Sequence, residues 1–132
     1  MFHGERITIA PTGMEVEDSA IHMLRNNGRD GLSVDAGGIC NGRNSGYQAV
    51  NIAVLAGAER IILLGYDGRV VDGKTHCFPG GHPDKTHGGM FSKEYRSMVE
   101  PLRKIGVEVL NATPGSAIDA FPKVDLCRAL SA

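Results

Sequence analysis

A short polar motif, Asn44-Ser45-Gly46, lies where a glycine-rich stretch leads into an apolar helical pattern. At such a junction the first main-chain N–H groups of a helix have no acceptor within the helix, and the helix dipole adds partial positive charge. Both features favour binding of an anion or of a nucleotide phosphate. Further hydrogen-bond donors nearby belong to Asn41, Arg43 and Gln48. The alternative is that Asn44 or Ser45 serves only as the N-cap of the helix, and the two interpretations are compatible.

A second candidate, Gly65-Tyr66-Asp67, follows a continuous apolar run directly. Open α/β sheets bind ligands in the crevice outside the carboxyl ends of their strands, so Asp67 is placed to contact a ribose hydroxyl, a metal or a transferred proton. The alternative for Asp67 is a turn aspartate that accepts a bond from the backbone two residues on. The fingerprint GxGxxG is absent, so an ordinary dinucleotide site is not supported.

The third candidate is a set of histidines, His76, His82 and His87, in a long polar segment between two helical patterns. Imidazole can act as a general acid or base near neutral pH, or it can bind a divalent metal together with carboxylates. The spacing matches no zinc signature, and solvated loop histidines are an equally good interpretation. Acidic and thiol side chains interleave with the histidines: Asp72, Asp84 and Cys77.

Helices and strands must position these residues. In the first third of the chain, the sequence signals for such elements are weak. Residues 6–10 read as a strand, and apolar residues recur at helical spacing over residues 16–27. Residues 31–34 suggest a second short strand. Residues 37–43 contain so much glycine that we expect a loop.

The pattern becomes clear from Ser45 onward. Residues 45–56 predict a helix that is apolar over much of its surface and is closed by Gly57, and residues 60–65 predict a buried central strand. A helix, a short turn and a buried strand form the second half of an α/β unit, so we expect a parallel sheet with right-handed connections. The remaining elements are expected to be a helix over residues 90–105 that is kinked or split at Pro101, a strand over 107–111 and a last helical turn within 124–130.

Length and composition limit the classes of protein to which this chain can belong. A chain of 132 residues fits one domain, and a formal net charge of −1 argues against a nucleic-acid partner. The longest apolar run, residues 61–64, is too short for a membrane span, and no signal peptide is evident at the start, so we expect a cytoplasmic protein without a membrane partner. Three cysteines without CxxC spacing argue against a disulfide framework, and we expect them to be structural: Cys40, Cys77 and Cys127.

The chain resembles a known family over about residues 37–122. Segments 44–53, 57–67 and 73–76, and later 111–118 and 120–122, are similar to phage and prophage Rossmann-like proteins related to the 6-hydroxymethylpterin diphosphokinase-like domain. A more distant similarity links the same succession of motifs to bacterial sialyltransferases that use CMP-sialic acid.

This resemblance implies a Rossmann-like three-layer sandwich, an α/β fold with a small, mostly parallel sheet. It implies a nucleotide site at Asn41, Asn44, Ser45, Gly46, Gly65 and Asp67, and catalysis by His76 or His82 together with Asp67. Family domains begin with a further βαβ segment carrying Gly-x-Gly-Pro-Ser, which this sequence lacks. We therefore expect a fragment, a late-start form or a chain that has lost part of the pocket.

The leading hypothesis is a nucleotide-binding protein, and in its enzymatic form a transferase that uses a nucleotide-activated donor. Its ligands would be a nucleotide such as CMP or a nucleotide sugar, with Mg²⁺ as a candidate ion. One rival is a non-catalytic remnant that self-associates into a homo-oligomer, because exposed sheet edges invite pairing. Another rival is a metal-dependent hydrolase built on Asp67 and the three histidines of the polar segment.

Overall fold

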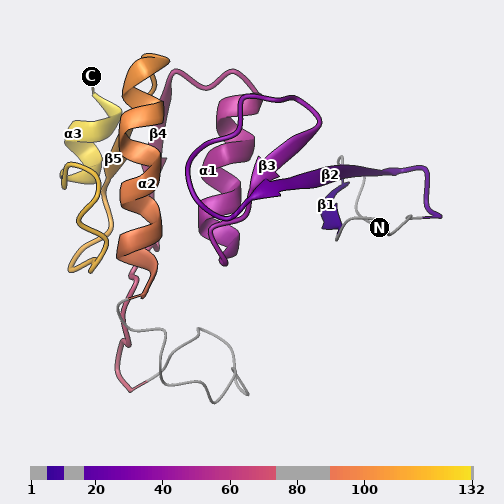
Figure 1. The fold of residues 1–132 in the computed structure, drawn as a ribbon. Coiled ribbons are helices and arrows are strands. Elements are labelled where there is room, and N and C mark those ends of the chain that lie inside the picture. The colour runs from indigo at the N-terminus through magenta and orange to yellow at the C-terminus, as the bar shows by residue number, and fades with distance from the viewer. Residues whose placement is uncertain (1–5, 11–16, 74–89, 132) are drawn as a thin grey trace.

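The computed structural model describes residues 6–10, 17–73 and 90–131 (Figure 1). Its elements, in chain order, are β1 (Arg6–Ala10), β2 (Ile21–Gly28), β3 (Gly38–Cys40), α1 (Ser45–Leu55), β4 (Arg60–Leu63), α2 (Met90–Lys104), β5 (Glu108–Asn111) and α3 (Leu126–Leu130). The described strands form two parallel sheets, β1-β2-β3 and β4-β5. The prediction of an α/β chain with parallel strands is therefore confirmed, although the strands divide into two small sheets.

The later elements follow the sequence pattern closely. Asn44 caps α1 at its start, and a Schellman arrangement ends it: Gly57 donates to Val54 O (2.9 Å) and Ala58 donates to Ala53 O (3.0 Å). Gly57 takes a φ of 86°, which glycine adopts without steric cost. The chain then enters β4, which pairs in parallel with β5, and α2 runs alongside both strands (Figure 1).

The predicted split of α2 at Pro101 does not occur, since one helix runs from Met90 to Lys104. Proline removes one N–H from the helical ladder and strains the turn before it. The helix continues because its apolar face packs in the core through Tyr95, Met98 and Leu102, all of them almost fully buried. Packing of a whole face outweighs the loss of one hydrogen bond.

The predicted helix over residues 16–27 is wrong, because residues 21–28 form strand β2. Arg6 to Ala10 pair with Ile21 to Arg25 on one side, and Arg25 and Asn26 pair with Gly38 and Ile39 on the other. Hydrogen bonding to two neighbouring strands overrides the helical spacing of a few apolar residues. Asn26, Asn27 and Gly28 also have low helix propensity.

Two further expectations need correction. Residues 31–34 form a loop instead of a strand, and residues 37–43, expected to be a loop, contain β3. The glycines there allow close approach: a Cβ on Gly38 would lie 2.4 Å from Asn27 Oδ1, and one on Gly37 would lie 2.9 Å from Arg25 Nη2. In this segment glycine makes room for a neighbouring strand.

The core lies where α1, α2, β3, β4 and β5 meet. Its buried apolar members are Cys40, Tyr47, Val50, Leu63, Tyr95, Met98, Leu102, Val109, Ile118 and Phe121. Sheet β1-β2-β3 extends from this body (Figure 1), and several of its apolar side chains remain open to solvent, with Ile7 45% and Met23 43% exposed. Across the described residues, no helix is long and apolar enough to cross a membrane.

Polar contacts hold the segment after β2 against α2. The buried carboxylate of Glu94 accepts from Arg29 (2.9 Å), Ser97 Oγ accepts from Gly31 N (2.8 Å), and the hydroxyl of Tyr47 donates to Gly31 O. These bonds join residues far apart in sequence. They anchor the carboxyl end of β2 to the rest of the molecule.

A fully buried asparagine on α1 ties β3 and the loop before it to the helix. Asn51 Oδ1 accepts from Ser33 N and from Cys40 N, both at 3.0 Å, and Asn51 Nδ2 donates to Ser33 O at 2.8 Å. One side chain therefore satisfies three main-chain groups in the interior. Burying main-chain polar groups without hydrogen-bond partners lowers the stability of the fold.

We expect Asn51→Ala to lower the free energy of unfolding by about 3 kcal/mol, since two N–H groups and one carbonyl lose their partners. Urea unfolding followed by circular dichroism measures this. The control is Gln48→Ala on the same helix, whose side chain makes one long bond (3.3 Å) to Asn41 O and should cost less than about 1 kcal/mol. Equal losses for the two variants would contradict the anchoring by Asn51.

Candidate functional site

A cavity of about 420 Å³ opens where the first turn of α1 faces the carboxyl end of β4. It is lined by Asn44, Ser45, Gly46, Ala49, Gly65, Tyr66, Asp67, Gly68, Phe91, Tyr95 and Ile118. The structure thus brings together five residues predicted from sequence: Asn44, Ser45, Gly46, Gly65 and Asp67. Their convergence is the one expected for the strand ends of a parallel α/β unit.

The side chain of Asn44 is occupied by structural bonds. Its Oδ1 accepts from Tyr47 N (2.8 Å), as an N-cap does, and also from the hydroxyl of Tyr95 (3.0 Å). Its Nδ2 donates to Gly42 O (3.0 Å). The capping interpretation of Asn44 is therefore confirmed, and the groups left for a ligand at this turn are the main-chain N–H groups of Ser45 and Gly46.

Those two N–H groups lie before the first hydrogen bond of the helix, which Gln48 N donates to Asn44 O (3.3 Å). The helix itself therefore supplies them with no acceptor. Gly46 also keeps this turn close to an aromatic wall of the cavity, which Tyr66 and Tyr95 form. A Cβ on Gly46 would lie 2.7 Å from the hydroxyl oxygen of Tyr95 and 2.8 Å from Cε1 of Tyr66, so a larger residue would push the turn away.

The loop after β4 is held by the loop after β5. Thr113 Oγ1 accepts from Tyr66 N (3.0 Å), Ser116 Oγ donates to Tyr66 O (2.6 Å), and Asp67 O accepts from Ala117 N (2.7 Å). Within the described residues the carboxylate of Asp67 shows no bond to the backbone two residues on. The main chain of Asp67 is thus fixed at the lining of the cavity.

The second loop is itself organised by a buried asparagine at the end of β5. Asn111 Nδ2 donates to Ser116 Oγ (3.0 Å) and to Ile118 O (3.1 Å), and Asn111 Oδ1 accepts from Thr113 N (3.0 Å). Ile118 then packs close to Gly68, where a Cβ would lie 2.7 Å from Ile118 Cγ1. The floor of the cavity is therefore built by residues of both β-strand ends.

The aromatic wall of the cavity was not predicted from the sequence. All three tyrosines of the chain form one cluster, in which Tyr66 and Tyr95 line the cavity and Tyr47 is buried behind them. The ring centroids are 5.5 Å apart for Tyr47 and Tyr95 and 6.2 Å apart for Tyr66 and Tyr95. Tyr66 donates its hydroxyl to Gly46 O (3.2 Å). Tyr47 and Tyr95 looked like ordinary helix residues, and only their apolar spacing on each helix marked them as buried.

Burial raises the pKa of all three phenols above the ordinary value. Desolvation is the main cause for Tyr47, Tyr66 and Tyr95, and the neighbouring phenols add to the increase at Tyr95. Burial also raises the pKa of the Cys40 thiol, with a further contribution from the charge of Asp30. These groups are neutral at physiological pH, and Asp67 is the acidic residue that lines the cavity.

Other predicted residues are not brought to this cavity. Asn41 lines a second cavity, which shares Ser45 and Ala49 with the first. His76, His82 and His87, with Cys77 and Asp84, lie outside the described residues, so their catalytic or metal-binding use stays a prediction. In the described part of the chain no three His, Cys, Asp or Glu residues are grouped to hold a metal.

Comparison with protein-family models, with curated proteins and with solved structures finds no match to this chain. The lining of the first cavity offers two main-chain donors at a helix start, one carboxylate, and the aromatic residues Tyr66 and Phe91, in a volume of ligand size.

The tyrosine cluster predicts how stability changes at alkaline pH. The folded pKa values are raised above the unfolded value of 10.0, so the unfolded chain loses its phenolic protons first. Stability from this source should be complete below pH 10 and should fall as the pH rises above it. Near-ultraviolet absorbance of phenolate, recorded with circular dichroism, should show ionisation of the tyrosines only together with unfolding. Ionisation near pH 10 in a chain that keeps its helices would contradict the burial of the cluster.

Proposed function

We propose that this chain is a nucleotide-binding protein of Rossmann-like type, with its ligand in the cavity between α1 and β4. The observation that carries the proposal is the convergence of the start of α1 (Ser45 and Gly46), Asp67 and the aromatic residues Tyr66 and Phe91 around one cavity. A volume of about 420 Å³ lies within the usual range for small-molecule sites. In this interpretation the two sheets and their helices form the layers of one sandwich.

Each part of a nucleotide has a matching group. The phosphate accepts from the N–H groups of Ser45 and Gly46, where the helix dipole adds partial positive charge. The Asp67 carboxylate accepts from ribose hydroxyls, as the acidic residue at a strand end does in other α/β sites. The base packs against Tyr66 or Phe91, since aromatic faces stack on any base.

Mg²⁺ also fits this arrangement. The cavity offers one carboxylate, and Mg²⁺ is commonly held by one or two carboxylates together with substrate phosphates and water. Asp67 is the residue that would hold it, and the ion would neutralise phosphate charge. The described residues that line the cavity include no Lys or Arg, so the positive potential there comes from the start of α1 and from such an ion.

The transferase form of the hypothesis needs a group that moves a proton, and the sequence assigns this step to His76 or His82. Binding does not depend on that assignment. We therefore propose nucleotide binding as the primary function and transfer from a nucleotide-activated donor as its extension.

Ser45 allows a direct test of the phosphate contact, because it is the first residue of α1. Proline is well tolerated at this position, and the extended Asn44 (φ −152°, ψ 151°) suits a following proline. Ser45→Pro therefore removes the N–H and keeps the helix, while Ser45→Ala removes only the hydroxyl. In a thermal-shift screen with CMP, CDP, GTP and ATP, with and without Mg²⁺, we expect a nucleotide to raise the melting temperature of the natural chain and of Ser45→Ala. Ser45→Pro should lose most of the increase.

Asp67→Asn supplies the second arm of this experiment, with Asp72→Asn as its matched control. Asp72 is exposed and has a φ of 49°, which asparagine tolerates, so the control changes the same charge without strain. Asp67→Asn should weaken binding and Asp72→Asn should not. If no nucleotide shifts the melting temperature of the natural chain, or if Ser45→Pro and Ser45→Ala respond alike, the proposed site is wrong.

A second candidate function is assembly with another copy of the chain. Among the described strands, β1 pairs with β2 alone, and Ile7 on β1 and Met23 on β2 are 45% and 43% exposed. An edge strand with apolar side chains is a template for pairing with another strand. We propose that β1 edges from two copies associate.

Light scattering coupled to size exclusion tests this assembly at high micromolar concentration. We expect a dimer or larger species for the natural chain and a monomer for Ile7→Lys, because a charge on an edge strand opposes pairing. Val34→Lys is the control, since Val34 is 68% exposed in a loop and the variant should behave as the natural chain does. A monomeric natural chain would exclude assembly through β1.

A further inference from the structure

A second and larger cavity, of about 690 Å³, lies between β1 and the first turns of α1. Ser45 and Ala49 line both cavities, so the two cavities adjoin at the start of α1. None of the groups proposed above to bind the nucleotide base or ribose lines this second cavity. A ligand in the second cavity would therefore contact other groups.

The charge in this cavity is unbalanced. Arg43 is the cationic residue among the described lining residues, and no Asp or Glu is found among them. Six other arginines have carboxylate partners: Arg6, Arg25, Arg29, Arg60, Arg96 and Arg103. The guanidinium of Arg43 has no hydrogen bond or ion pair within the described residues, which leaves its five donors available to an anion.

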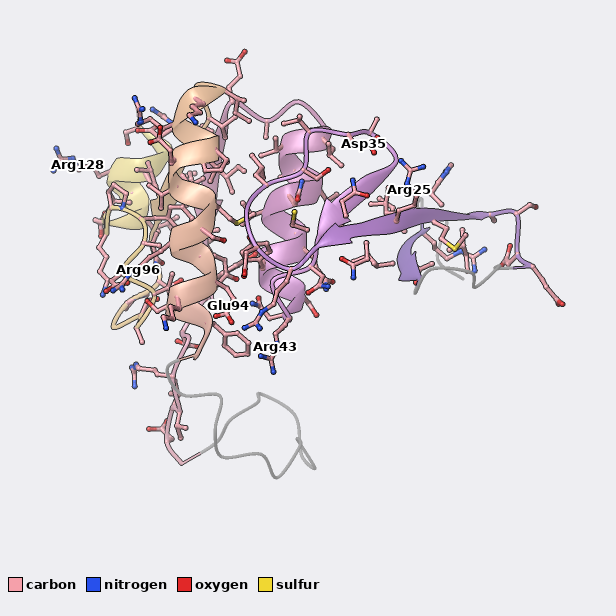
Figure 2. All side chains as sticks on the ribbon, viewed as in Figure 1. Arg25, Asp35, Arg43, Glu94, Arg96 and Arg128 are labelled. Atoms are coloured by element: carbon pink, nitrogen blue, oxygen red, sulfur yellow. The ribbon has the colours of Figure 1, made fainter. Side chains whose placement is uncertain are left out.

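The backbone holds Arg43 in this place. Its φ is 58°, a left-handed conformation that is uncommon for a residue with a side chain. The turn is stabilised by Asn41 Oδ1, which accepts from Arg43 N (2.9 Å), and by Arg29 O, which accepts from Gly42 N (2.9 Å). Figure 2 shows Arg43 below the start of α1, near the level of Glu94, whose carboxylate is already paired with Arg29.

Apolar side chains from two elements also line the cavity. They belong to Ile7 and Ile9 of β1 and to Ala49 and Ile52 of α1, beside the polar residues Thr8, Asn26, Asn41, Ser45 and Gln48. An apolar body with a single anionic group matches this lining, because burial of aliphatic surface is favourable and a guanidinium pairs well with a carboxylate. A compact inorganic anion would leave the isoleucines unused.

We propose that this cavity binds a small organic anion with an aliphatic body, its acidic group paired with Arg43 and its chain lying against Ile7, Ile9 and Ile52. Its anion-binding residue, Arg43, is not among the residues proposed to bind the nucleotide. The chemistry is that of a medium-chain carboxylate.

Titration calorimetry with decanoate below its micellar concentration tests the proposal on the full chain. We expect saturable binding to the natural chain and a loss of affinity of about tenfold or more in Arg43→Gln, since a charge-assisted pair disappears. Arg43→Lys keeps the charge and should retain part of the affinity. The matched control is Arg128→Gln, because Arg128 lies on the α3 side of the molecule, away from Arg43 (Figure 2). It should bind as the natural chain does.

Two further measurements make the outcome decisive. Decyltrimethylammonium has an equally long aliphatic chain with the opposite charge, and it should not bind. Thermal unfolding of Arg43→Gln should match that of Arg128→Gln, so that loss of binding reflects the lost charge and not loss of the fold. The proposal is overturned if decanoate does not bind, if the cation binds equally well, or if Arg43→Gln and Arg128→Gln bind alike. Failure of the nucleotide screen would leave this result unaffected, and Asp67→Asn, which changes a residue outside the lining of the second cavity, should still bind decanoate.

Discussion

The buried amide of Asn51 is the contact on which the arrangement of the first half of the chain depends. Sheet β1-β2-β3 has little apolar surface against the body, and its third strand is only three residues long. The hydrogen bonds from Ser33 N and Cys40 N to Asn51 place β3 against α1. With β3 in place, the turn at Gly42 leads directly to the N-cap of α1, and this places the start of the helix beside the two adjoining cavities.

Aromatic packing around Tyr95 stabilises the fold and also shapes the cavity near β4. Tyr95 stands between Tyr47, Tyr66 and Phe121, with ring centroids 5.5 to 6.2 Å away. Its hydroxyl reaches the capping residue Asn44 (3.0 Å), so the core and the start of α1 are joined by one side chain. The cavity is rigid, because the start of α1 and the loop after β4 that line it are each held by a second set of contacts.

The parts of the fold that the sequence predicts correctly are those whose signals are local. The helix beginning at Ser45, the strand at residues 60–63 and the helix from Met90 all combine continuous apolar patterning with caps or glycine stops. The convergence of Asn44 with Asp67 was also predictable, because the ends of an α/β unit meet by topology.

What could not be predicted depends on partners distant in sequence. β2 is mostly exposed and forms because β1 and β3 flank it, while β3 forms because glycine lets it approach Asn27. The tyrosine wall joins α1, α2 and the loop after β4, which no single segment reveals. The carboxylate pairing that six other arginines have and Arg43 lacks is likewise a property of three-dimensional contacts.

The division into two sheets has a consequence for the order in which the molecule folds and opens. Strands β1 to β3 come from residues 6–40, whereas β4 and β5 are brought together by α2 across a longer stretch of chain. The first unit can pair early because its strands are close in sequence, yet it holds few buried side chains and needs α1 to stay docked. Native-state excursions should therefore release β1 and β2 while the tyrosine core remains intact, so that the cavity beside Arg43 opens and closes far more often than the one beside Asp67.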